Sequence, residues 1–218
     1  MDKDIIIEKT KDFVYKKMKG EGSGHDWWHI YRVYNTAVAI AKEENGADIF
    51  IVELAALLHD IADWKFNDGN LNAGAEVTIS FLEDLGVDKL VVEQVADIVR
   101  NISFKGAGEK STIKTLEGKI VQDADRLDAI GAVGIARTFA YGGNKNREMY
   151  NPDIKPEDHK DFESYKNSNG TTINHFYEKL LLLKDRMNTE AGKRIAAKRH
   201  KYMEDFLKEF YAEWDGKL

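Results

Sequence analysis

The sequence predicts an all-α protein that folds as a single domain, and three observations support this. Only two prolines, Pro152 and Pro156, occur in the chain, and they lie close together. Long amphipathic runs recur with helical spacing, and no segment shows the convincing alternation that is typical of a half-buried strand. A chain of 218 residues can bury one well-filled core but is only just long enough for two small domains.

Five helices are expected in the N-terminal half. Apolar spacing and stop signals place them at about 4–18, 26–44, 48–61, 73–85 and 88–101. Asp26 is a plausible N-cap of the second, and Asn45-Gly46 is a good stop for it. The helix at 48–61 is apolar nearly all round, so we expect it at the centre of the core.

The C-terminal half is expected to contain one long helix, a polar segment and two further helices. The long helix covers about 113–140 and ends at a Gly-Gly pair. Residues 143–170 are polar, contain both prolines and lack periodicity, which predicts a long flap-like loop. The last two helices are expected at about 171–187 and 190–214.

Composition narrows the classes of function. The net charge of −6 argues against binding to polymeric nucleic acid, which needs clustered Lys and Arg. Without cysteine, any metal ligands must be His, Asp, Glu or backbone oxygens. No apolar run approaches the roughly 18 residues of a membrane span, and the charged N-terminus is unlike a signal peptide. The expected location is therefore the cytoplasm.

Three histidines fall at informative places. His25 and His29 open the second predicted helix, and His59 is followed directly by Asp60 at the end of the apolar third helix. A His-Asp pair is costly to bury unless something binds it. A divalent cation binds both members at once, provided that the imidazole is neutral and the carboxylate ionised.

A second cluster of carboxylates lies within an otherwise apolar helix. Asp123, Asp125 and Asp128 surround Arg126, and the last two Asp share a helix face. Taken singly, each feature is more often structural: a satisfied histidine, a solvated acidic face, a cap at Asp26. Taken together, they favour a metal site, with Asp123 and Asp125 as alternative ligands because residues two apart face nearly opposite sides of a helix.

These residues resemble the pattern of the HD-domain superfamily of metal-dependent phosphohydrolases: a His, a His-Asp pair and a distant Asp. The pattern is matched by His29, His59-Asp60 and Asp125. Local contexts resemble one bacterial branch that includes enzymes similar to nucleotide pyrophosphohydrolases. They are His59-Asp60-Ile61-Ala62-Asp63, Ile102-Ser103-Phe104-Lys105-Gly106, Asp123-Ala124-Asp125-Arg126-Leu127-Asp128, Phe139-Ala140-Tyr141-Gly142-Gly143 and Thr172-Ile173-Asn174-His175-Phe176-Tyr177.

The resemblance implies an all-α fold, one divalent metal ion and hydrolysis of a phosphate ester or anhydride. It makes His29, His59, Asp60 and Asp125 the expected ligands. Mn²⁺ is the expected ion, with Mg²⁺, Co²⁺, Ni²⁺, Fe²⁺ and Zn²⁺ left open; Ca²⁺ fits less well because it prefers oxygen ligands. A metal-site core at about 20–142 would precede the 143–170 flap and the C-terminal helices at 171–214.

The reaction needs groups beyond the ligands. Asp63, one turn after Asp60, is the candidate general base, or else a loop cap. Arg32 shares the face of His29, and Lys65 follows the His-Asp pair on a loop, so both are candidates to hold phosphates.

Other residues are candidates for binding the rest of a nucleotide. Lys105, on a Gly-flanked loop, and Arg126 would meet phosphates, and Tyr141 would stack on a base. Asp128 would line the site or pair with an arginine, Arg126 or Arg32. The flap, which follows two glycines that permit hinge motion, is expected to gate the site, unless it is a plain surface insertion.

The expected reaction splits a nucleoside triphosphate into a nucleoside monophosphate and pyrophosphate. A nucleoside 5′-monophosphatase or another phosphomonoesterase is the chemical alternative. A non-catalytic nucleotide-sensing module and a helical interaction protein without a ligand are the others. A second metal is not expected, since no histidine lies between His59 and His159. The sequence leaves a homo-oligomer open.

Overall fold

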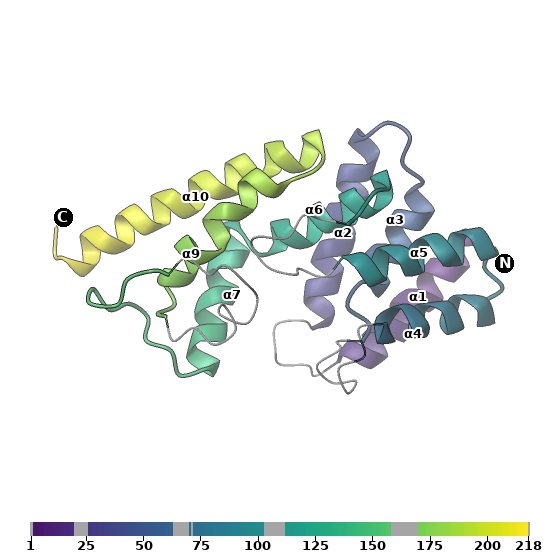
Figure 1. Cartoon of the computed structure of the whole chain (residues 1–218), viewed down its shortest axis with the longest axis horizontal. Helices are drawn as coiled ribbons and strands as arrows, with labels where there is room; N and C mark the ends of the chain where they lie inside the picture. The colour runs from purple at the N-terminus through teal and green to yellow at the C-terminus, as the bar shows by residue number, and fades with distance from the viewer. Residues whose placement is uncertain are drawn as a thin grey trace. The chain divides into compact units, whose positions relative to one another are not determined.

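All regular structure in the described part of the chain is helical. The computed structural model describes residues 2–19, 26–62, 70, 72–102, 112–157 and 170–217. Figure 1 shows its helices, which are α1 (Lys3–Met18), α2 (Trp27–Glu43), α3 (Ile49–Leu58), α4 (Ala73–Asp84), α5 (Lys89–Asn101), α6 (Leu116–Asp128), α7 (Gly131–Asn144), α9 (Asn174–Glu178), the 3₁₀ helix η2 (Leu180–Arg186) and α10 (Glu190–Trp214). The predicted all-α class is confirmed.

Side-chain caps explain where several helices begin. The carboxylates of Asp2, Asp26, Asp48 and Asp88 accept hydrogen bonds from backbone amides in the first turns of α1, α2, α3 and α5. Thr189 caps α10 in the same way. These amides have no partner within their helix, so each cap stabilises its helix by about 1 kcal/mol. The predicted N-cap role of Asp26 is confirmed.

The chain divides into two compact units. The first comprises Met1–Phe104 and Lys110–Ala124. Its centre is α3, which packs against α1, α2 and α5, while α4 packs against α5. Leu54, Leu57 and Leu58 of α3 are fully buried, so the prediction of a central third helix is confirmed.

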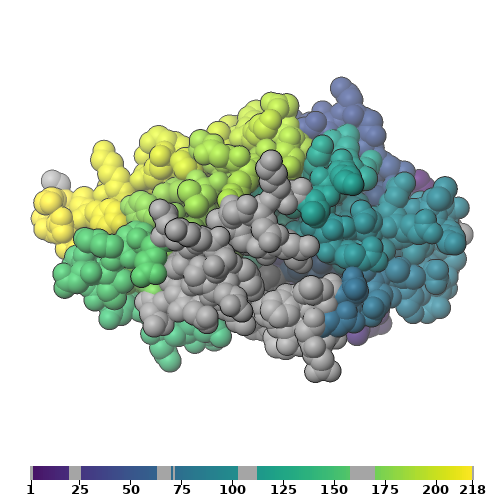
Figure 2. Space-filling view, in the orientation of Figure 1, coloured from purple at the N-terminus to yellow at the C-terminus, as the bar shows by residue number. Residues whose placement is uncertain are grey.

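The second unit comprises Lys105–Glu109 and Asp125–Leu218. Here α7 and η2 pack against the long helix α10, and α9 packs against η2. The core is rich in aromatic rings: Phe176 stacks on Phe206 with ring centroids 5.8 Å apart, and Phe139 meets Phe206 edge-on at 5.9 Å. In the space-filling view α10, in yellow, forms part of the surface (Figure 2). The single-domain organisation stays a prediction.

The predicted helix at 113–140 is wrong in two respects. The chain forms two helices, α6 and α7, because Gly131 adopts φ +80° and redirects the backbone. This left-handed conformation is open to glycine at little cost. The second helix also continues through Gly142 and Gly143, which were expected to end it.

The predicted helix at 171–187 is also wrong in extent. The chain forms the five-residue α9 and then the 3₁₀ helix η2. Just before it, the amides of Thr172 and Ile173 donate to the carbonyls of Glu148 and Met149, at 2.9 and 3.0 Å. Among the described residues, no helix has both the length and the apolar composition that a bilayer span requires.

Candidate metal centre

His29 is held by the first turn of α2. Its backbone amide donates to the Asp26 carboxylate at 2.9 Å, so the N-cap fixes the turn from which the imidazole projects. The residue is 1% exposed. A ring buried to this extent needs polar partners for both nitrogens, because an unmet nitrogen costs desolvation energy.

His59 follows the last residue of α3 and is held by a backbone contact. Its Nδ1 lies 2.9 Å from the carbonyl oxygen of Ala56. A carbonyl cannot donate a hydrogen bond, so Nδ1 carries the proton and, in the neutral ring, Nε2 is the nitrogen that carries the lone pair. The side chain is buried, and the lone pair is therefore presented inward as a metal ligand would be.

The two imidazoles and Asp60 converge on one point. The Nε2 atoms of His29 and His59 lie 3.3 Å apart. Oδ2 of Asp60 is 3.5 Å from Nε2 of His29 and 3.6 Å from Nε2 of His59. With Nδ1 of His59 protonated, Nε2 of His59 can accept a hydrogen bond from Nε2 of His29. The same nitrogens and the neighbouring carboxylate are groups that could bind a divalent cation instead.

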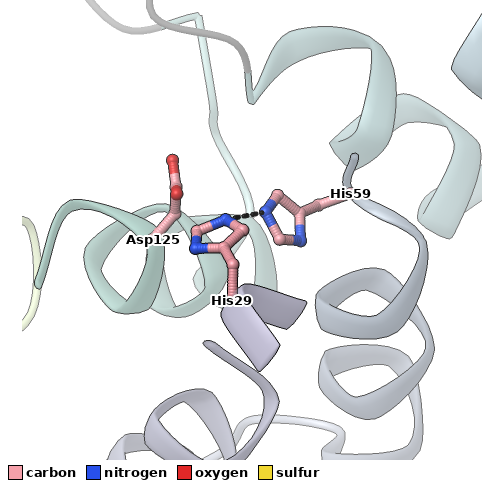
Figure 3. Close-up of side chains that lie close together, drawn as sticks. All are labelled: His29, His59 and Asp125. Carbon is pink, nitrogen blue, oxygen red and sulfur yellow. Dashed lines mark hydrogen bonds between the residues drawn. The ribbon is translucent and has the colours of Figure 1, made fainter. Parts of the chain in front are cut away.

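Asp125 joins this group from α6. One ligand atom from each of His29, His59 and Asp125 lies within 4.8 Å of the others. Figure 3 shows the two imidazoles meeting through their ring nitrogens and Asp125 rising from a separate helix beside the His29 ring. Asp125 directly follows Ala124, the last residue of α6 assigned to the first unit.

Asp123, the alternative ligand, is not in that group. It is fully buried, whereas Asp125 is half-buried. The two carboxylates therefore have different surroundings, as expected for residues two apart on one helix. The geometry favours Asp125 as the fourth group of the site.

The donor set fits a divalent transition metal. His29, His59 and Asp125 form one group of potential ligands, and Asp60 lies near both imidazoles, so the available donors are nitrogen and oxygen atoms. Such a donor set suits Mn²⁺, Fe²⁺, Co²⁺, Ni²⁺ or Zn²⁺ better than Ca²⁺. Burial of both histidines limits competition from water for the ion.

Three of the residues expected to act on phosphate, Asp63, Lys65 and Lys105, lie outside the described residues. Arg32 lies in α2, half-buried and one turn after His29. The face of α2 that carries His29 therefore also carries a cation.

The other predicted substrate-binding residues occupy defined positions in the second unit. The Arg126 guanidinium donates to the backbone carbonyl of Arg186. Asp128 is buried and forms an ion pair at 2.6 Å with Arg137, an arginine that the sequence had not suggested as its partner. Tyr141 is 46% exposed on α7, and the Nζ of Lys145 lies 5.8 Å from its ring centroid.

Sequence reasoning missed Arg137 and Arg199. Arg137 contacts Asp128, and Arg199 donates to the carbonyl of Leu127. A signal was available for the first, because Arg137 is the single charge in a run of small and apolar residues from 129 to 142. For Arg199 no signal was available, since it is one of many cations on α10.

Comparison with known proteins identifies the family to which the chain is similar. Residues 27–130 match the family described as HD domain. The chain is 38% identical to the Bacillus subtilis protein YpgQ over 210 residues, covering 96% of this chain and 94% of that protein. It also resembles a crystal structure of an HD-superfamily hydrolase from Bacillus thuringiensis, with 45% identity, a TM-score of 0.78 and coverage of 98% and 99% of the two chains.

YpgQ has itself been crystallised in complex with ADP. That structure matches this chain with 37% identity and a TM-score of 0.75, covering 95% of this chain and 97% of the other.

Proposed function

Because the chain belongs to the HD-domain family, we propose that it is a divalent-metal-dependent phosphohydrolase that acts on a nucleotide phosphoanhydride. The proposed products are a nucleoside monophosphate and pyrophosphate. The proposed ligands are His29, His59, Asp60 and Asp125, and Mn²⁺ is the proposed ion.

The convergence of the buried histidines and the carboxylates is the observation that carries the proposal. The Nε2 atoms of His29 and His59 lie 3.3 Å apart, and Asp60 reaches both. A divalent ion held by these groups would supply Lewis-acid chemistry to a phosphoryl oxygen and to the attacking water. The chain's part is to hold the ligands: the Ala56 carbonyl fixes the His59 tautomer, and the Asp26 cap fixes the turn that carries His29.

Charge favours a polyphosphate as the substrate. The two carboxylates among the proposed ligands cancel the charge of a divalent ion, so a substrate with several phosphates needs further cations. Arg32 lies one turn from His29, and we propose that it holds a phosphate together with Lys65 and Lys105. Asp63 is the proposed base that takes a proton from the attacking water. The ADP complex of the relative YpgQ supports a nucleotide ligand.

The test is product analysis on a panel of nucleoside tri-, di- and monophosphates with Mn²⁺, resolving pyrophosphate from orthophosphate. We expect each triphosphate that turns over to give a monophosphate and pyrophosphate in equal amounts. Asp125→Asn should lose this activity. Asp205→Asn, which removes an exposed carboxylate paired with Lys201 on α10, is the matched control and should retain it.

The alternatives predict different products. Orthophosphate released from monophosphates, with triphosphates left intact, would identify a monophosphatase and overturn the proposal. Nucleotide binding without turnover on any member of the panel would identify a sensing module instead.

A further inference from the structure

The last turn of α6, just after Asp125, is tied to two other helices by arginines. Nη1 of Arg199, on α10, donates to the backbone carbonyl of Leu127. Nη1 of Arg137, on α7, donates to Oδ2 of Asp128 at 2.6 Å and to its backbone oxygen at 3.3 Å. We call Arg137, Arg199 and Asp128 the arginine clamp. All three lie in the same compact unit as Asp125.

Helix electrostatics explain why cations gather here. The carbonyls of a last helical turn lack amide partners four residues on, and their dipoles leave partial negative charge at that end. The two guanidinium groups meet this charge. The carboxylate of Asp128 adds a full negative charge and is 4% exposed. Its short ion pair with Arg137 compensates a charge that would otherwise be costly to bury.

The chain makes room for Arg199 with a glycine. Gly131 adopts φ +80°, and a Cβ there would lie 2.9 to 3.2 Å from the side-chain carbons of Arg199. Position 131 therefore needs glycine both for its backbone conformation and for the space that the Arg199 side chain occupies. Burial lowers the pKa of the Arg199 guanidinium, and the charge of Asp128 opposes that effect. Arg199 thus has space beside Gly131, a hydrogen bond to the carbonyl of Leu127 and a favourable interaction with the charge of Asp128.

We propose that Arg137 and Arg199 are positioning residues for the metal ligand Asp125, acting through the last turn of α6. Asp125 lies two residues before the carbonyl that Arg199 holds and three before the carboxylate that Arg137 holds. Fixing this turn fixes the direction in which Asp125 projects. Metal ligands must be held to within about 0.5 Å of their productive position, and their supporting groups affect metal affinity by roughly 10- to 100-fold.

The proposal rests on the proposed metal centre, and a metal titration tests the two separately. Arg199→Met keeps an unbranched apolar stem and removes the guanidinium. Arg199→Lys keeps the charge but loses the planar fork. Lys198→Met changes the preceding, exposed residue of α10 and is the matched control. Each EDTA-treated protein is titrated with Mn²⁺ by calorimetry and with Co²⁺ by visible absorption, well below its own unfolding temperature.

Arg199→Met should bind Mn²⁺ about 10- to 100-fold more weakly than the parent and give an altered Co²⁺ spectrum. The Mn²⁺ affinity of Arg199→Lys should lie between those of the parent and Arg199→Met, and the affinity of Lys198→Met should equal that of the parent. Parental Mn²⁺ affinity and an unchanged Co²⁺ spectrum in folded Arg199→Lys and Arg199→Met would overturn the positioning role, whatever their thermal stability. If the parent protein itself binds neither ion, the proposed metal centre is wrong.

Gly131→Ala provides a second route to the same clamp without changing any charge. The new Cβ pushes on the Arg199 stem and strains the backbone. Weaker Mn²⁺ binding in this variant, confirmed as folded by circular dichroism, supports the proposal. Unchanged binding would contradict it.

Discussion

Asp125 and Asp123 provide a direct comparison, because the sequence leaves both open as ligands and only Asp125 lies with the histidines. The perturbation is a pair of near-isosteric changes, Asp125→Asn and Asp123→Asn. The proposed ligands come from α2, the end of α3 and α6, and therefore span residues 29 to 125 of the chain. Unfolding separates them, so the ion binds the folded state almost exclusively.

The size of the effect follows from this linkage. At a free Mn²⁺ concentration of about 100 times Kd, binding stabilises the fold by about 2.7 kcal/mol. For a protein of this size, that raises Tm by about 5–11 °C. If Asp125→Asn weakens binding about 100-fold, the same Mn²⁺ concentration gives only about 0.4 kcal/mol, or about 1–2 °C.

The assay is thermal unfolding of each variant in EDTA and in Mn²⁺. The difference between the two unfolding midpoints measures the stabilisation that Mn²⁺ binding contributes. Asp123 is fully buried, so Asp123→Asn is expected to lower both midpoints while keeping their difference. A full Mn²⁺ shift in Asp125→Asn, or loss of the shift in Asp123→Asn alone, would refute the assignment of Asp125 as a metal ligand.

Two predictions concern stability away from the metal. Burial, followed by a hydrogen bond to Glu53, raises the pKa of Tyr34 above its usual 10.0, so the free energy of unfolding should fall above pH 10.0, where only the unfolded chain loses this proton. Urea titrations across pH should show a shallower fall in Tyr34→Phe. A Cβ at Gly134 would clash with the carbonyl of Ala129, so Gly134→Ala should lose about 1–3 kcal/mol. Gly143→Ala, in the same helix with open space around it, should instead gain about 0.5–1 kcal/mol, and equal effects in the two variants would contradict the packing argument.

The parts of the fold that were predictable depend on local pattern. The helix expected at 190–214 forms as Glu190–Trp214, because its apolar residues keep helical spacing throughout. The break between α6 and α7 was not predictable in this way. Apolar spacing continues through Ala129-Ile130-Gly131, and the stem of Arg199, far along the chain, packs directly against the turn.

The same distinction applies to the site. His29, His59, Asp60 and Asp125 were predicted as ligands from their order and local context. The structure groups His29, His59 and Asp125 and places Asp60 near both imidazoles, and the ligand assignment stays a prediction. The contacts that hold the end of α6 next to Asp125 could not be predicted from the sequence.

Asp128 was expected to pair with Arg126 or Arg32, because those residues are near it in the sequence or share the expected site. Asp128 pairs with Arg137 instead. The turn at Gly131 sets the direction of α7, and the guanidinium of Arg137 on that helix reaches the end of α6. The contact between Asp128 and Arg137 depends on the φ angle of Gly131, which the residue pattern around it does not predict.

The most direct test of the metal centre is anomalous diffraction from crystals of this protein grown with Mn²⁺. We expect one strong anomalous peak bound by Nε2 of His29, Nε2 of His59 and the carboxylates of Asp60 and Asp125. The absence of a peak between the two histidines, or a peak bound by Asp123 in place of Asp125, would contradict this ligand assignment.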